Sequence, residues 1–221
     1  MINSLAGLYF NGLSVEGEGV FLQETKIFIN FAVHSLFHSG LLFNFPSAMS
    51  DNNYRKLGVA PRFHEILSTG LYTGLLPGAP GTYAAFVALL IWYGLYVWLS
   101  PLTLTIVTLA LVVVVTVVGA WTSQVMERYW GPDPRAVVID EYVGTWIACL
   151  VAPCAPPHEQ YTWLMAFLGF ALFRVIDITK PLGCRKIEQV CPGGWGVMLD
   201  DVLAGFYAML IVWGIRWCFG L

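Results

Sequence analysis

Charged residues are scarce in this chain: lysine, arginine, aspartate and glutamate make up 11% of its 221 residues, whereas 57% are hydrophobic. A soluble domain carries roughly 25% charged residues, so this composition excludes an ordinary soluble protein and indicates an integral membrane protein. The net charge of −3 gives no basic surface of the kind that binds nucleic acid, which excludes that class of partner. At this length we expect one folded domain.

Several signatures of enzyme sites are also missing. The five cysteines have no metal-type spacing, and we expect no disulfide between Cys184 and Cys191 because their loop should face the cytoplasm. The chain has no P-loop and lacks the eight-residue-spaced aspartates of CDP-alcohol phosphotransferases. Its four histidines have no neighbouring serine and arginine of the kind that histidine-dependent phosphatases need.

Residues 1–48 differ in composition from the rest of the chain, since their apolar part is interrupted by asparagine and histidine. The polar stretch after Met49 resembles an ordinary N-terminus. We therefore interpret 1–48 as an extension from a start codon assigned too early. The expected organisation is this extension, a polar segment over 49–61, and a membrane domain over 62–221.

Long apolar stretches predict an all-α helical membrane bundle with about five spans. No charged residue occurs between Glu65 and Glu127, and each stretch approaches the ~20 residues that a bilayer requires. The spans are expected at 82–99, 102–121, 136–151, 161–178 and 199–217. We also expect a short interfacial helix within 63–76 and a polar loop with solvated charges over 124–135.

Outside the extension and the spans themselves, basic residues fall only in alternate connections, apart from Arg216 at the C-terminal end. The positive-inside rule therefore predicts that these connections face the cytoplasm. They contain Arg55, Lys56, Arg62, Arg128, Arg135, Lys180, Arg185 and Lys186.

Three acidic motifs are expected at that same cytoplasmic face. Asp140 and Glu141 begin one span, Asp177 ends another, and Asp200 and Asp201 follow a glycine-rich turn. Charged residues at the edge of a membrane helix are costly, so they usually have a function. Clustered carboxylates repel one another unless a cation neutralises them, and Mg²⁺ prefers oxygen ligands. We predict a divalent metal site formed by these five residues.

Basic and backbone groups in the same region can attract a phosphate. Arg174, Asp177 and Lys180 fall at i, i+3 and i+6 on one helix, so they should share a face. Gly81 and Thr82 follow Pro80 at a helix start, where Thr82 would be the N-cap and backbone N–H groups can bind phosphate. Structural alternatives remain open: a plain helix start here, salt bridges at Asp177, and helix-dipole partners at the other acidic residues.

These motifs together resemble one enzyme family. Pro80-Gly81-Thr82, residues 140–144, residues 173–181 and residues 193–205 resemble the phosphatidylglycerophosphatase A family in order and spacing, from about Phe63 to the C-terminus. The resemblance implies an all-helical Mg²⁺-dependent enzyme of the bacterial inner membrane. Such an enzyme hydrolyses phosphatidylglycerophosphate to phosphatidylglycerol and phosphate, a step toward cardiolipin.

The chemistry that we expect is metal-assisted hydrolysis of a phosphomonoester. Asp140, Glu141, Asp177, Asp200 and Asp201 would hold one or two Mg²⁺ ions, and Arg174 and Lys180 would bind the phosphate. The nucleophile is either water or an aspartate that becomes phosphorylated. The alternative function is a small cation transporter or channel, but such proteins place their charges near the membrane midplane rather than at one edge.

The orientation gives a first prediction. A cysteine placed between Arg128 and Arg135 should react with a membrane-impermeant thiol reagent only after the membrane has been opened, because that connection is expected in the cytoplasm. Labelling in intact cells would reverse the predicted topology and contradict a cytoplasmic site.

Overall fold

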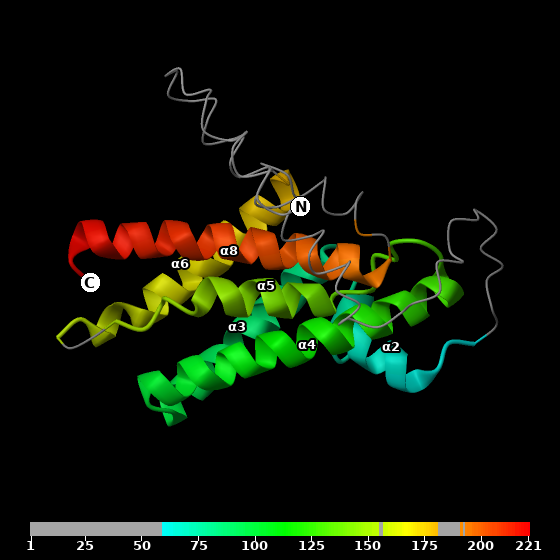
Figure 1. The fold of residues 1–221 in the computed structure, drawn as a ribbon, viewed down its shortest axis with the longest axis horizontal. Coiled ribbons are helices and arrows are strands. Elements are labelled where there is room, and N and C mark those ends of the chain that lie inside the picture. Colours follow the sequence, from blue (N-terminus) through cyan, green and yellow to red (C-terminus); the bar gives the residue numbers. More distant parts are fainter. Residues whose placement is uncertain (1–58, 155–156, 181–190, 192) are drawn as a thin grey trace, which may run out of the picture. The chain divides into compact units, whose positions relative to one another are not determined.

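Helices form the regular structure of this computed structural model, which describes residues 59–154, 157–180, 191 and 193–221. All of these residues lie in one unit, Asn53–Leu221. The expected extension over 1–48 and Cys184 lie outside the described residues. The elements, drawn in Figure 1, are α2 (Arg62–Ser68), η2 (Thr73–Leu75), α3 (Pro80–Trp98), α4 (Pro101–Trp130), α5 (Ile139–Cys149), η3 (Glu159–Tyr161), α6 (Thr162–Thr179) and α8 (Gly194–Phe219).

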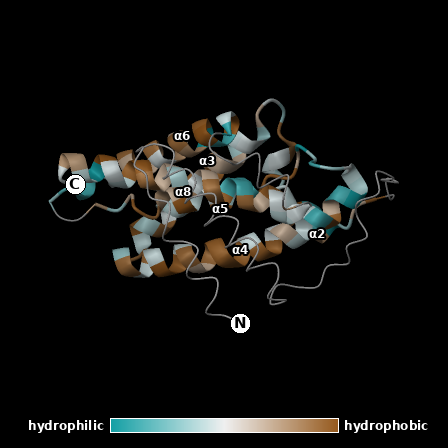
Figure 2. Ribbon diagram, turned by 45° about the horizontal axis from the view of Figure 1, so that its top comes forward, coloured by the Kyte–Doolittle hydropathy of each residue, from teal (hydrophilic) through white to brown (hydrophobic). Residues whose placement is uncertain are grey.

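Four stretches of the described residues are long and apolar enough to cross a membrane: α3, α4, η3 with α6, and α8. The outward surface of α4 is rich in valine, and Figure 2 shows strongly hydrophobic residues along α4 and α6. Large apolar side chains such as Val113 and Ile106 are exposed there, as expected for contact with lipid acyl chains. The predicted all-α fold is confirmed, and the chain is a membrane protein.

The expected third span is instead a short central helix. α5 has 11 residues and is about 16 Å long, about half the ~30 Å hydrocarbon core. Every residue from Glu141 to Cys149 is buried, because α5 packs against α3, α4, α6 and α8. The prediction of five spans is therefore not confirmed. The apolar composition of α5 reflects burial in protein rather than contact with lipid.

Two helix boundaries differ from the sequence prediction. α3 begins at Pro80, whose fixed φ suits the first helical position, so Thr82 lies inside the first turn and the N-cap prediction was wrong. α4 continues to Trp130 and stops only at Gly131, which has a φ of 93°. The first seven residues of the predicted loop over 124–135 are thus helical. Glu127, expected to be solvated, is only 6% exposed.

The start of α8 also lies earlier than expected. Gly193 has a φ of 74° and precedes the helix, which begins at Gly194 rather than at Leu199. A side chain on Gly194 would lie 3.0 Å from the Ala120 carbonyl carbon of α4, so this glycine lets the two helices approach closely. Asp200 and Asp201 consequently lie in the second turn of α8. Their proposed role as partners of the dipole in the first turn is therefore wrong.

The central crossing of α5 and α8 depends on two glycines. A Cβ on Gly205 would lie 2.9 Å from the Gly144 Cα, and a Cβ on Gly144 would lie 3.0 Å from the Asp201 carbonyl oxygen. Small residues let membrane helices approach to backbone contact in this way. Gly205 thus allows close helix packing, and the crossing brings Asp201 beside α5.

Gly205→Ala should destabilise the protein by about 1–3 kcal/mol, because the added methyl group overpacks this crossing. Gly214→Ala on the same helix is the matched control, since no atom lies within 4 Å of its Cβ position. The control should be neutral or slightly stabilising because alanine favours helix. Denaturant unfolding of both variants in detergent measures the difference. Equal stability would contradict the close crossing.

Candidate active site

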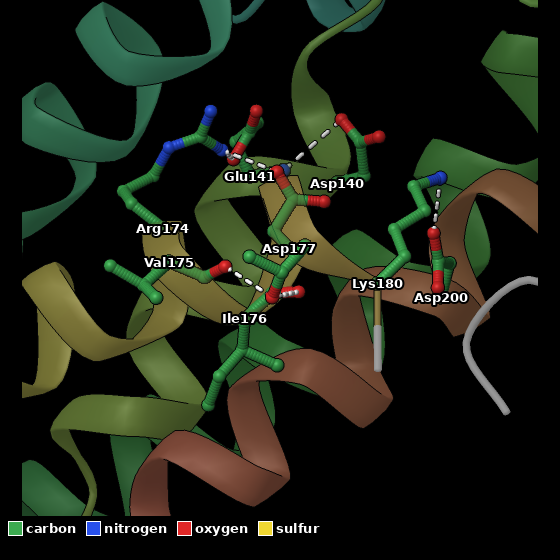
Figure 3. A network of polar contacts seen from close by, with 9 residues as sticks. Asp140, Glu141, Arg174, Val175, Ile176, Asp177, Lys180 and Asp200 are labelled. Atoms are coloured by element: carbon green, nitrogen blue, oxygen red, sulfur yellow. Dashed lines mark hydrogen bonds and ion pairs between the residues drawn. The ribbon is translucent and has the colours of Figure 1, made fainter. Parts of the chain in front are cut away.

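Four helices place their polar residues at one end of the bundle. α5 contributes Asp140 and Glu141 from its first turn, and α6 contributes Arg174 and Asp177 from its last turns. α8 contributes Asp200 and Asp201, while the first turn of α3 faces Glu141 through Gly81. Figure 3 shows most of these side chains pointing toward one another. The convergence predicted from the sequence is present in the structure.

Arg174 joins two carboxylates from different helices. Its Nη1 atom donates to Glu141 on α5 and to the Asp177 Oδ2 atom, which is 2.9 Å away. All three side chains are largely buried. The i, i+3 relation of Arg174 and Asp177 is the one predicted for this helix. Removing the arginine would leave two buried carboxylates without their cation, which is costly in a low-dielectric setting.

Lys180 has a different position from the one predicted. It is the C-cap of α6 with φ 44° and ψ 56°, a left-handed conformation, so it leaves the helix face that carries Arg174 and Asp177. Its Nζ atom lies 2.6 Å from Asp200 Oδ2 on α8. The prediction of one shared face for the three residues was therefore wrong for Lys180. The backbone turn directs this lysine toward α8.

Asp177, Asp200 and Asp201 form a group with metal-ligand geometry. One carboxylate oxygen from each residue lies within 4.8 Å of the others. Asp200 and Asp201 are each only 4% exposed, and Asp200 Oδ1 and Asp201 Oδ2 have no hydrogen-bond partner among the described residues. A buried carboxylate oxygen without a partner is costly. Three oxygen donors in such a setting fit a divalent cation of the Mg²⁺ type.

Asp140 and Glu141 lie next to this group without being part of it. Asp140 Oδ1 accepts the backbone N–H of Glu141 at 3.1 Å, and Glu141 pairs with Arg174. Their assignment as metal ligands stays a prediction. The site has five carboxylates, whereas Arg174 and Lys180 supply only two positive charges. The site therefore has a surplus of three negative charges when all seven groups are ionised.

Gly81 brings the start of α3 against the ion pair. A Cβ at this residue would overlap the Glu141 carboxylate and lie 3.3 Å from Arg174 Nη2, so no other residue type fits here without movement. Thr82 lies in the same turn. Helix N-termini carry partial positive charge, and those of α3 and α5 both face the site. Binding of phosphate by Gly81 and Thr82 stays a prediction.

Glu127 is a buried acidic residue that the sequence analysis had placed among solvated loop charges. Glu127 Oε2 lies 3.6 Å from the Cβ position of Gly193 at the start of α8. The available signal was helical spacing, because Glu127 continues a buried stripe of α4 through Gly119 and Ser123.

Comparison with known proteins gives a consistent result. The family described as Phosphatidylglycerophosphatase A matches residues 66–216. A Bacteroides thetaiotaomicron protein named "Putative phosphatidylinositol-3-phosphatase" is 44% identical over 155 residues, covering 70% of this chain and 94% of that protein. The protein named phosphatidylglycerophosphatase A from Haemophilus influenzae is 32% identical over 175 residues, covering 76% and 98%. Its namesake from Escherichia coli is 30% identical over 159 residues, covering 71% and 86%. No solved structure matches the chain.

The carboxylate group predicts direct cation binding. Titration of the purified protein with Mn²⁺, followed by the electron paramagnetic resonance signal of the free ion, should reveal binding that Mg²⁺ competes away. Asp201→Asn should weaken the affinity at least about tenfold, because it removes one charged oxygen ligand. Glu159→Gln, an exposed carboxylate at the opposite end of α6, is the control and should bind as the unaltered protein does. Equal affinity for all three proteins would rule out this site.

Proposed function

Because the chain belongs to the phosphatidylglycerophosphatase A family, we propose that it hydrolyses phosphatidylglycerophosphate to phosphatidylglycerol and phosphate. Family membership makes the chain a lipid phosphatase, and this argues against the alternative of a cation channel or transporter. The observation that carries the proposal is the group formed by Asp177, Asp200 and Asp201, which lies at the end of membrane helices where lipid phosphates are found.

We assign the cofactor as Mg²⁺, with Asp177, Asp200 and Asp201 as its ligands and with Asp140 and Glu141 beside them. A bound Mg²⁺ would offset the negative charge of the phosphate and so favour nucleophilic attack at phosphorus. The support for this assignment is the donor set: the three carboxylates are close together, and two of their buried oxygens have no partner among the described residues. The surplus of three negative charges supports the same assignment.

The basic residues have two tasks in this proposal. Arg174 holds Glu141 and Asp177 in fixed positions, which pre-organises the site before substrate arrives. Lys180 contributes a positive charge beside Asp200, and the first turns of α3 and α5 contribute the positive ends of their dipoles. Together these groups attract the phosphate. Gly81 and Thr82 would donate backbone N–H groups to it.

Proton transfer falls to the carboxylates outside the metal group. Asp140 or Glu141 would accept the proton when water attacks phosphorus, which releases the lipid alcohol and phosphate. The other route begins with attack by an aspartate carboxylate and passes through an aspartyl phosphate that water then hydrolyses. Both routes use the same binding site, and trapping of a phosphorylated protein from substrate that carries a radiolabelled phosphate distinguishes them, because only the second route forms one.

A second candidate substrate is phosphatidylinositol 3-phosphate. The observation that favours it is the relative with that activity in its name, which is 44% identical to this chain. Both lipids carry a phosphomonoester on a polyol head group, so the same carboxylates and basic residues would serve. The two substrates differ in the bulk of the head group beyond the phosphate.

We further propose that the site faces the cytoplasm at the bacterial inner membrane. The basic residues Arg128 and Arg135 flank the connection that leads from α4 to the acidic turn of α5. A cytoplasmic site fits a role in phospholipid synthesis, where the product supplies phosphatidylglycerol and cardiolipin.

Phosphate release from purified protein in mixed micelles tests the function. Phosphatidylglycerophosphate should be hydrolysed in Mg²⁺, and a chelator should abolish the reaction because the carboxylates then lack their cation. Phosphatidylinositol 3-phosphate, measured in parallel as kcat/KM, decides between the two substrates. Asp201→Asn should lower kcat by about 10³-fold or more, whereas Glu159→Gln should leave it unchanged. Hydrolysis of neither lipid, by protein shown to be folded, would refute the proposed function.

A further inference from the structure

The connection between α2 and η2 has an unusual backbone. Gly70, Leu71 and Tyr72 have φ angles of 54°, 58° and 69°, so three consecutive residues adopt the left-handed conformation. Glycine adopts it readily, but residues with a Cβ rarely do, and runs of this kind are uncommon. A strained conformation persists only where its surroundings determine it, and it often marks a functional segment.

Buried hydrogen bonds hold this turn in place. Tyr142 donates its hydroxyl to the Gly70 carbonyl at 3.0 Å, and Thr73 donates its hydroxyl to the same carbonyl at 2.8 Å. The Thr69 hydroxyl accepts the backbone N–H of Tyr72 at 3.1 Å. Tyr142 follows Glu141 directly in α5, so the turn is attached to the helix that carries the carboxylates.

The turn presents apolar side chains outward. Leu71 is 65% exposed and Tyr72 is 46% exposed, and the nearby Leu75 and Leu76 are similarly exposed. No lysine, arginine, aspartate or glutamate occurs between Glu65 and Glu127, so this surface contains none of the charges that a water-facing loop usually carries. We call residues 70–76 the apolar turn.

Chain connectivity places the apolar turn next to the membrane. With only residues 77–79 between them, the apolar turn is followed by α3, a candidate membrane helix that begins at Pro80, and η2 packs against α3. The Tyr83 hydroxyl reaches back to within 3.9 Å of the Gly78 Cβ position. Exposed apolar side chains continue onto α3 with Tyr83 and Phe86, so the apolar turn extends the lipid-facing surface of that helix.

We propose that the apolar turn inserts into the head-group boundary of the bilayer and holds the carboxylate site at the depth of the lipid phosphates. The partner is the lipid surface itself. Leucine can bury its apolar side chain at that boundary, and tyrosine can bury its ring while its hydroxyl stays hydrated. The Tyr142–Gly70 hydrogen bond attaches the turn to α5, so the depth of the turn also sets the depth of Glu141 and its neighbours. Only this link to catalysis rests on the proposed function.

Spin labelling in phosphatidylcholine vesicles tests the insertion without any substrate. The labels go on Leu71→Cys, on Val113→Cys as the lipid-facing reference and on Arg135→Cys as the water-facing reference. Each variant also has serine in place of the exposed Cys218 and of Cys184, which lies outside the described residues. The label at position 71 should collide with oxygen several-fold more than with a water-soluble nickel complex, as at position 113. A ratio like that of position 135, or shielding from both reagents by protein, would overturn the proposal.

Kinetics test the link to catalysis. The double variant Leu71→Ser with Tyr72→Ser should raise KM for a bilayer-embedded lipid phosphate about threefold or more with kcat little changed. A dihexanoyl form of the same lipid, dissolved as monomers, should be hydrolysed with unaltered KM because it needs no membrane depth. Equal losses on both substrates would show a merely structural role and overturn this part. Failure of unaltered protein on both lipids would refute the proposed function instead, leaving the spin-label result standing.

Discussion

The clustering of five carboxylates between apolar helices, three of them buried, is the constraint on which the rest of this structure depends. Each would be costly alone near a bilayer, and together they repel one another. Arg174 offsets part of this repulsion by bridging α5 and α6, and Lys180 offsets part of it by joining the end of α6 to α8. The remaining negative charge is the basis on which we propose a cation at this site. Stability and function therefore draw on the same groups.

Close backbone approach is what brings those groups together. Gly144 and Gly205 let α5 and α8 cross in contact, and Gly81 lets α3 reach the Arg174–Glu141 pair. Gly194 does the same for α8 against α4. Each glycine removes a side chain at a point where two helices would otherwise stand farther apart. The position of a carboxylate is thus set by residues that have no chemistry of their own.

Local patterns in the sequence were enough to predict the helical membrane fold and the convergence of the acidic motifs. They failed where tertiary packing decides the outcome. The apolar stretch that forms α5 has the composition of a membrane span. It is a short helix because Gly131 ends α4 and the loop after it determines where the chain turns back into the bundle. The direction of Lys180 depends on a left-handed cap, which residue spacing does not reveal. Helical spacing did contain the signal for the burial of Glu127, but the prediction of a loop over 124–135 set it aside.

The unequal lengths of α4 and α5 have a consequence for where the carboxylates lie. α4 has 30 residues and is about 45 Å long, so it exceeds the hydrocarbon core by about 15 Å. Ile139, at the start of α5, packs beside Gly119, which lies 11 residues before the end of α4. The acidic turn is therefore recessed by about 16 Å below the tip of α4. The carboxylates of this lipid phosphatase therefore lie alongside a membrane helix rather than beyond its end.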